Sequence, residues 1–394
     1  MNKTRTRFAP SPTGYMHIGN LRTALFEFLI AKHEGGDFLL RIEDTDQERK
    51  VEGAVDVIYK TLKECGLNWD EGPDIGGDFG PYVQSERLPM YKGYAEELIK
   101  LGGAHYCFCS EEEIEAQRKE AESLGISFKF NDPCKHLSAE EVQAKLDAGE
   151  PYVIRQTIKN VGETYFDDEV YGRIEVDGDV LDEQILIKSD GYPTYNFANI
   201  IDDHQMQISH VVRGNEYLSS TPKYNLIYDA YGWDRPTYVH VPPVMKDEHH
   251  KLSKRNGDAS FQDLVAKGYL PDAIMNYIAL LGWAPETEQE IYTLDELIKV
   301  FNIHRISKSP AIFDIDKLTW MNGVYLRNMD EDTCYETVRP YLEKAVHGPY
   351  NLKEIAKIIQ PRIDILNQIE ESVDFFDTLV DYDLELYRHK KMKT

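Results

Sequence analysis

The sequence of 394 residues predicts an α/β protein with a parallel sheet, followed by a mainly α-helical C-terminal region. Near the start, a strand-like run at 4–9 leads through a proline- and glycine-rich loop into a helix whose apolar residues recur on one face. A buried strand at 38–42 follows. A strand–helix–strand crossover of this length makes the two strands parallel. From residue 261 onward the apolar pattern is helical.

Length and composition limit the class of protein. A chain of 394 residues is too long for one core, so we expect several domains. The formal charge of −25 argues against a surface that coats nucleic acid generally, but it leaves room for a local basic groove. No apolar run is long enough to span a bilayer, and five cysteines, an odd number, fit a reducing compartment. We therefore expect a cytoplasmic protein with no membrane partner.

The loop between the first strand and the first helix carries the first candidate site. Residues 7–20 read RFAPSPTGYMHIGN, which places His17 and the Gly19 amide at the first turn of the helix. Unpaired amides and the positive dipole end favour an anion there, and His17 can donate to phosphate oxygens. A plain strand-to-helix turn with a surface histidine is the alternative. The sequence has neither a G-x-G-x-x-G motif nor a P-loop, so the dinucleotide and P-loop interpretations are excluded.

A basic cluster stands out in this acidic chain. Residues 246–257 read KDEHHKLSKRNG and follow two prolines. In a loop over a bound triphosphate, Lys251 and Lys254 would act as point charges that stabilise phosphate oxygens as negative charge builds on them. The alternative is a solvated basic loop with no function.

Together, the two stretches resemble the two signatures of class I aminoacyl-tRNA synthetases, in the glutamyl and glutaminyl branch. The chain is similar to bacterial glutamyl-tRNA synthetases from Arg5 to about Arg327. The resemblance implies a Rossmann-like catalytic domain and a ligase that activates L-glutamate with ATP and transfers it from glutamyl-adenylate to the 3′ end of tRNA(Glu). It implies catalytic roles for His17, Lys251 and Lys254, and an ATP site made of His17, Gly19, Glu216, Lys251, Leu252, Ser253, Lys254 and Arg255. Mg²⁺ would bind through the phosphates.

Charge also points to an amino-acid pocket. Arg7 and Arg213 end predicted strands that face the crevice, and a guanidinium fork suits a carboxylate. Glu43 and Ser11 suit an ammonium group, and Tyr195 and Asn199 add neutral hydrogen bonds. The resemblance assigns these six positions to substrate glutamate. Any one arginine at a strand end is ordinarily a surface ion pair, but the joint occurrence of these residues around both signatures favours a substrate pocket.

Cysteine spacing predicts a further site. Cys107, Cys109, Cys134 and His136 form two close pairs and would close a tetrahedral structural Zn²⁺ site with no open position. The alternative is accidental spacing. Some members of the resembled family carry such a zinc site, and others lack it.

The resemblance and the changes in sequence texture divide the chain into five parts. We expect the first catalytic half at 1–88, an inserted acceptor-stem-binding domain at 89–189 and the second catalytic half at 190–245. A stem-contact region at 246–329 and one helical anticodon-binding domain at 330–394 would follow, with a second such domain missing. We expect a monomer, and charging of tRNA(Gln) is left open.

Three rival functions remain. A shortened paralogue that loads glutamate onto a modified tRNA base lacks helical anticodon domains, so residues 330–394 speak against it. A glutaminyl-tRNA synthetase binds a neutral side-chain amide and needs no second cation in its pocket, so the presence of Arg213 argues against this function. A non-catalytic tRNA-binding relative would have little reason to keep both phosphate-facing signatures.

Overall fold

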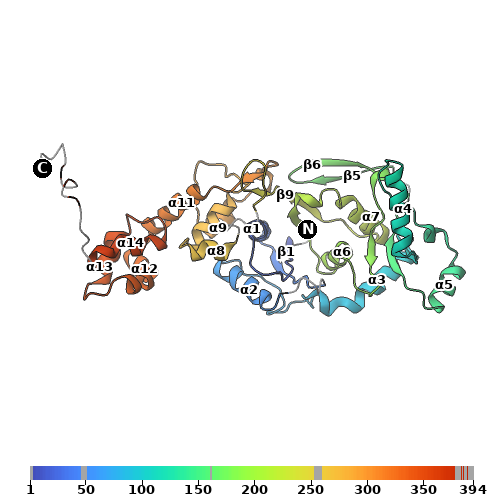
Figure 1. Cartoon of the computed structure of the whole chain (residues 1–394), viewed down its shortest axis with the longest axis horizontal. Helices are drawn as coiled ribbons and strands as arrows, with labels where there is room; N and C mark the ends of the chain where they lie inside the picture. Colours follow the sequence, from blue (N-terminus) through green and yellow to red (C-terminus); the bar gives the residue numbers. More distant parts are fainter. Residues whose placement is uncertain are drawn as a thin grey trace.

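The computed structural model describes residues 3–45, 51–159, 162–252 and 260–377, together with three single residues further on. The molecule is elongated (Figure 1). The C-terminal helices form one end, α4 and α5 lie at the other, and most of the strands lie between them. This arrangement confirms the predicted fold class, an α/β body followed by a helical region.

The strands fall into four sheets. The pairs β1–β2 and β10–β11 are parallel, and β3-β4-β7 is antiparallel. The sheet β6-β5-β9-β8 is mixed, because β5 and β8 run parallel to β9 while β6 runs antiparallel to β5. The Ser209 amide, just before β8, donates to the Arg5 carbonyl at 3.0 Å and joins β1 to β8. The strands are β1 (Arg5–Phe8), β2 (Asp37–Leu40), β3 (Ala104–Cys107), β4 (Val153–Gln156), β5 (Glu163–Asp168), β6 (Gly172–Asp177), β7 (Ile185–Ile187), β8 (His210–Gly214), β9 (Thr237–Val241), β10 (Val244–Met245) and β11 (Ala311–Ile312).

The helices surround these strands and build the C-terminal end. They are α1 (Ile18–His33), α2 (Ala54–Glu64), α3 (Leu88–Lys100), α4 (Glu111–Ser123), α5 (Ala139–Asp147), α6 (Tyr195–Gln205), α7 (Thr221–Tyr231), α8 (Phe261–Ala266), α9 (Pro271–Ala279), α10 (Leu294–Val300), α11 (Ile315–Asn328), α12 (Glu331–Ala345), α13 (Leu352–Ile359) and α14 (Ile369–Val373). Across the described ranges, none of these helices combines the length and the apolar character that crossing a membrane requires.

Helix α1 is the centre of the main hydrophobic core. Its residues Ile18, Leu21, Leu25 and Leu29 recur at helical spacing and are buried against β1, β2 and α9. The turn back to β2 is tight at Gly36, where an added Cβ would overlap the Thr4 carbonyl oxygen. Glycine therefore lets β2 start directly beside β1.

The predicted insertion at 89–189 is structurally more complex than its sequence indicated. Strands β3, β4 and β7 form a separate sheet with α4 and α5 outside it, but the hairpin of β5 and β6 extends the central sheet through β9. Sequence reasoning missed β3, β5 and β6. Both hairpin strands are rich in charged residues, and β6 has no fully buried position; its apolar residues Ile174 and Val176 alternate with charged ones over too short a run to stand out.

A chain of side-chain amides joins the insertion to α6 and α7. Gln184 donates to Gln156 at 2.9 Å and accepts from Asn196 of α6 at 2.9 Å. Asn196 in turn accepts from the Tyr224 hydroxyl of α7 at 2.6 Å. The insertion is therefore tied by partly buried polar contacts to the helices that border the candidate site.

The C-terminal helices have a core of their own. Helices α12, α13 and α14 bury Val338, Leu342, Ile355 and Ile369 in a hydrophobic cluster. The predicted amphipathic helices after residue 330 are thus present in the described residues.

Candidate active site

The carboxyl ends of β1, β2 and β8 bring three of the predicted residues to one edge of the sheet. The Glu43 amide donates to the Pro10 carbonyl at 3.1 Å, so the loops after β1 and β2 run side by side. Arg7, Glu43 and Arg213 are buried, and each interacts electrostatically with the Tyr195 hydroxyl. This edge is where ligands of parallel sheets bind.

The first turn of α1 begins where the sequence predicted, but its polar groups are already engaged. His17 is the N-cap residue, and its Nδ1 accepts from the Gly19 amide at 3.0 Å. The neutral ring then carries its proton on Nε2, which lies 3.0 Å from the Leu252 carbonyl oxygen and donates to it. For an anion to bind at this turn, the Gly19 amide and His17 Nε2 would have to give up these hydrogen bonds and donate to the anion instead.

The second signature reaches the first one directly. The chain turns back after β10, where the Leu252 amide donates to the Val244 carbonyl at 3.1 Å; Leu252 is buried and Lys251 is exposed. On the far side of the loop, the Phe261 amide donates to the Met16 carbonyl at 3.2 Å. Both flanks of the basic loop therefore contact the start of α1. Three of its predicted residues lie outside the described residues: Ser253, Lys254 and Arg255.

Arg7 belongs to a buried charge cluster. Its Nε donates to Asp203 Oδ1 at 2.8 Å and its Nη1 to Glu27 Oε1 at 3.1 Å. Burial opposes the charge, but Asp203 and Glu27 raise the pKa of Arg7 above its ordinary value. Burial also raises the pKa of Glu27 well above its usual range, although Arg7 acts against this. Arg7 is therefore already paired.

Arg41 joins Glu43 to the same cluster. Its guanidinium is fully buried and donates to Glu43 Oε1 at 2.9 Å and to Asp203 Oδ1 at 2.8 Å. Burial raises the pKa of Glu43, against the effect of Arg41 and Arg7. Within the described ranges, Glu43 Oε2 accepts no hydrogen bond, so this oxygen is free for a cationic ligand.

Helix α6 presents the neutral groups. Tyr195 lies at its first position with 36% of its surface exposed, and its ring is 5.6 Å from that of Tyr217. One turn later, Asn199 is buried, and its Nδ2 has no hydrogen-bond partner. A buried amide without an acceptor is costly, so this group fits a ligand oxygen. Asp203 follows at the same spacing, which puts all three on one helix face.

Arg213 differs from Arg7 in its surroundings. Its Nη2 donates to the Thr221 hydroxyl at 2.8 Å, and its guanidinium lies 5.3, 4.8 and 5.4 Å from the ring centroids of Tyr217, Tyr224 and Tyr238. Among the residues whose structure is described, no carboxylate lies within 4.0 Å of it. Arg213 is thus a buried cation held by neutral groups.

The remaining nucleotide and pocket positions lie at the rim. Glu216 is exposed after β8, and its carboxylate folds over Gly214, where an added Cβ would overlap it. Ser11 is exposed in the loop after β1, and its carbonyl accepts from the Thr13 amide at 2.9 Å.

The predicted metal ligands are only partly brought together. Cys107, Cys109 and Cys134 gather with Asp132, and their four ligand atoms all lie within 4.8 Å of one another. The sulfurs of Cys109 and Cys134 are 3.7 Å apart, close to the edge of about 3.8 Å expected for a zinc–thiolate tetrahedron with bonds of about 2.3 Å. His136 is exposed and is not part of this group. Asp132, which sequence reasoning missed, occupies the fourth corner.

The donor set also fits a cation electrostatically. Burial raises the pKa of the Cys107 thiol to about 11, so a cation is needed to hold it as thiolate. Asp132 stays ionised: burial opposes its charge, but hydrogen bonds from His105, Cys107 and the Cys134 amide lower its pKa. Three thiols around an ionised carboxylate suit Zn²⁺.

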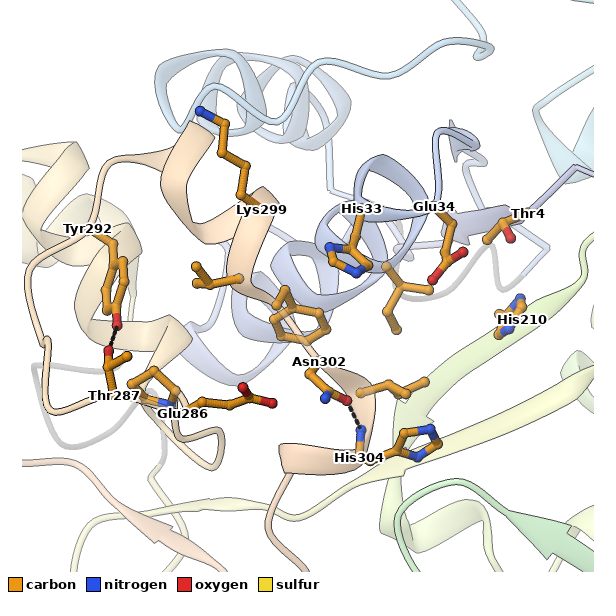
Figure 2. A pocket seen from close by; sticks show the side chains of 15 residues that line it. Thr4, His33, Glu34, His210, Glu286, Thr287, Tyr292, Lys299, Asn302 and His304 are labelled. Carbon is orange, nitrogen blue, oxygen red and sulfur yellow. Dashed lines mark hydrogen bonds between the residues drawn. The ribbon is translucent and has the colours of Figure 1, made fainter.

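A cavity of 760 Å³ lies elsewhere (Figure 2). It is lined by Thr4, which precedes β1, by His210 at the start of β8, and by His33 and Glu34 at the end of α1. These are the opposite ends of the strands and helix from the candidate site. The cavity therefore does not belong to that site.

Sequence reasoning named Arg7, Glu43 and Arg213, which lie at this edge of the sheet, but missed the charged side chains that contact two of them. Asp203, Arg41 and Glu27 hold the predicted residues in place. Asp203 could have been found, because it continues the four-residue spacing of Tyr195 and Asn199. Glu27 and Arg41 carried a weaker signal, a charge within an otherwise apolar segment.

Comparison with known proteins gives the family. The model of the family "tRNA synthetases class I (E and Q), catalytic domain" matches residues 3–320, and that of "Anticodon binding domain" matches 333–394. Glutamate–tRNA ligase from Clostridium botulinum strain Hall is 61% identical over 393 residues, which cover 100% of this chain and 81% of the relative. Glutamate–tRNA ligase from Clostridium acetobutylicum is 60% identical over 394 residues, with the same coverage of both chains.

Solved structures agree. A glutamate tRNA ligase from Elizabethkingia meningosepticum, in complex with its amino acid, superposes with a TM-score of 0.90 at 37% identity, covering 95% of this chain and 80% of that one. Glutamate-tRNA synthetase from Elizabethkingia anophelis gives a TM-score of 0.88 at 38% identity, covering 95% and 81%. The fold and the paired signatures thus define a class I tRNA synthetase catalytic domain. Within that class, the chain belongs to the glutamate–tRNA ligase family.

Proposed function

We propose that this chain activates L-glutamate with ATP and transfers the glutamyl group to the 3′ end of tRNA(Glu). The observation that carries the proposal is the contact between the two signatures. His17 and Leu252, 235 positions apart, meet at 3.0 Å, so Leu252 of the second signature lies against the first turn of α1. The chain spans 81% of the length of the relatives it matches, and all of the proposed pocket lies within that span.

The proposed reaction begins with adenylation. An oxygen of the glutamate α-carboxylate bonds to the α-phosphorus of ATP, the bond to the β,γ-phosphates breaks, and pyrophosphate leaves with the electron pair. His17, Lys251 and Lys254 would stabilise the phosphate oxygens. Mg²⁺ would neutralise phosphate charge when bound with ATP. The terminal ribose hydroxyl of tRNA then displaces AMP.

The surroundings of the two arginines indicate how the substrate would bind. Arg7 is paired with Asp203 and Glu27, whereas Arg213 has only neutral partners. Arg213 is therefore the cation that receives the side-chain carboxylate of glutamate, and Arg7 orders the pocket wall behind it. Glu43 Oε2 and Ser11 would take the ammonium group.

Two neutral groups and the nucleotide position complete the pocket. The unpaired Asn199 amide and the Tyr195 hydroxyl would donate to glutamate oxygens. Glu216, Gly19 and Leu252 would border the nucleotide. A glutaminyl-tRNA synthetase is disfavoured because the neutral amide of glutamine would leave Arg213 buried without a counter-charge.

We further propose that the cysteine cluster binds Zn²⁺ and stabilises the insertion. The thiolates of Cys107, Cys109 and Cys134 would provide three ligands; the structure supplies Asp132 as the fourth, and the sequence spacing supplies His136. Measuring the zinc content of Asp132→Asn and His136→Ala, with Cys334→Ala as control, decides between the two residues. If zinc is retained in both of these variants and also in Cys109→Ser, the proposed site is wrong.

The wider assignments follow the family. We propose an inserted acceptor-stem domain at about 89–189 and an anticodon-contacting helical part after residue 330. The enzyme would act as a monomer in the cytoplasm, with tRNA(Gln) as a further substrate to test.

The proposal is tested by ATP–pyrophosphate exchange with glutamate or glutamine, each with and without total bacterial tRNA. We expect glutamate-dependent exchange that requires tRNA. Arg213→Gln should lose exchange with glutamate, while His210→Ala, on the same strand, should keep it. No exchange under any condition, in a folded sample that binds ATP, would favour a tRNA-binding protein instead.

A further inference from the structure

We propose that Asp168 and His240 are positioning residues that hold Arg213 without neutralising it, so that its charge remains available to the substrate carboxylate. This inference rests on the proposed function, because it assigns a role to the groups behind the glutamate-binding arginine. Asp168 ends β5, Arg213 lies in β8 and His240 lies in β9, so three adjacent strands bring the groups together.

The carboxylate of Asp168 is fully engaged. Its Oδ1 accepts from the amides of Val170 at 2.9 Å and Tyr171 at 2.8 Å. Its Oδ2 accepts from the His240 amide at 3.1 Å and from His240 Nδ1 at 2.6 Å. Four N–H groups therefore surround a carboxylate whose side chain is 0% exposed. These four donors satisfy both oxygens of the carboxylate, and in the described part of the chain no arginine or lysine forms an ion pair with it.

The tautomer of His240 follows from this contact. Because Asp168 accepts the Nδ1 proton, the neutral ring presents the lone pair of Nε2. Arg213 Nε lies 3.1 Å from this nitrogen and donates to it. Burial lowers the pKa of His240 and keeps the ring neutral. A protonated ring would instead place two cations in contact.

Thr221 fixes the other side of the guanidinium. Its hydroxyl donates to the Tyr217 carbonyl at 2.9 Å and therefore accepts from Arg213 Nη2 at 2.8 Å. Two of the five guanidinium N–H groups are thus held by uncharged acceptors. Within the described part of the chain, no side chain or carbonyl accepts from the other three. The fork is oriented, and its free donors suit a planar carboxylate.

His240 acts as a neutral spacer. If Asp168 contacted Arg213 directly, the pair would be neutral, as Arg7 is with Asp203, and the attraction for an incoming carboxylate would be weaker. With the ring between them, the negative charge is held one side chain further away while the hydrogen-bond chain stays continuous. This arrangement of Asp168, His240 and Arg213 thus favours glutamate over glutamine, because the side-chain amide of glutamine carries no charge.

The test is calorimetric titration of the whole chain with glutamate and, separately, with ATP. We expect His240→Ala to weaken glutamate binding about 10-fold or more and Arg213→Ala about 100-fold. His240→Gln, whose amide oxygen can accept near the Nε2 position, should stay within about 3-fold of the unaltered chain. ATP affinity should stay unchanged in all three, and His210→Ala should change neither affinity.

The outcomes separate the two proposals. If the unaltered chain binds ATP but binds no glutamate even with total bacterial tRNA present, the proposed function and this inference both fail. If Arg213→Ala loses glutamate but His240→Ala keeps it, only the positioning role is wrong. Nitrogen NMR of the His240 ring gives a readout that does not depend on any variant folding: we expect a proton on Nδ1 and none on Nε2, and the reverse tautomer would overturn the inference.

Discussion

Replacing Asp203 by asparagine tests the buried charge cluster. Asp203 Oδ1 accepts from Arg7 and from Arg41, each at 2.8 Å, and all three side chains are at most 5% exposed. Removing one partner of such a buried pair costs about 3–5 kcal/mol, because the remaining charges stay desolvated. Asparagine keeps one acceptor, so we expect the lower end, about 3 kcal/mol. At roughly 2–4 °C per kcal/mol, the melting temperature of the catalytic part should fall by about 6–12 °C.

The matched control has the same geometry without the burial. Asp182 accepts from Lys223 at 2.8 Å, but its side chain is 73% exposed. Exposed pairs contribute at most about 1 kcal/mol, so Asp182→Asn should shift the transition by a few degrees at most. Scanning calorimetry of both variants measures the difference. Equal shifts would show that desolvation does not set the strength of the Asp203 contacts, which would refute the reasoning.

Three further predictions concern stability and nucleotide binding. Gly36→Ala would place a Cβ on the Thr4 carbonyl and should destabilise the chain by about 2–4 kcal/mol in urea unfolding, whereas a loss below about 1 kcal/mol would contradict the close approach. Gly19→Ala would bring a Cβ to 3.3 Å from His17 Nδ1 and should weaken ATP binding several-fold with little change in melting temperature; unchanged ATP affinity would speak against this turn as the phosphate site. Burial lowers the pKa of His240, so the unfolded chain binds this proton more readily than the folded one. Stability should therefore fall as pH drops below about 6.5, by up to about 1.4 kcal/mol per pH unit for this group, and His240→Gln should show a shallower fall in urea titrations between pH 7.5 and 5.5.

The sequence predicted those helices and strands that bury a regular row of apolar side chains. Helix α1 and strands β2, β8 and β9 were predicted close to their observed bounds, because continuous apolar runs or helical periodicity mark them. The hairpin of β5 and β6 was missed because charged residues dominate both strands and only Phe166 and Asp168 of β5 are fully buried. Pairing partners such as β5 and β9 lie about 70 residues apart, and no local pattern encodes them.

The candidate site was predictable where a residue type and its place at a strand end agree. Arg7, Glu43 and Arg213 satisfied that rule and lie at one edge of the sheet. Asp168 and His240 could not be found by that rule, because their proposed role depends on contacts between three strands that are distant in the sequence. His136 shows the opposite error. Its spacing favoured it as a metal ligand, but Asp132, the N-cap residue of the short turn at Cys134, lies with the three thiols instead.

Arg213 has no paired carboxylate in the described part of the chain, and this has opposite effects on stability and on ligand binding. A buried charge without a counter-ion lowers the stability of the ligand-free protein, so an apolar residue of similar size at this position should make the empty chain more heat-resistant while abolishing its affinity for a carboxylate. Ligand binding reverses this penalty, and glutamate at 100 times its dissociation constant would add about 2.7 kcal/mol. In the proposed binding mode, the substrate carboxylate would supply the counter-charge that Arg213 lacks in the ligand-free protein.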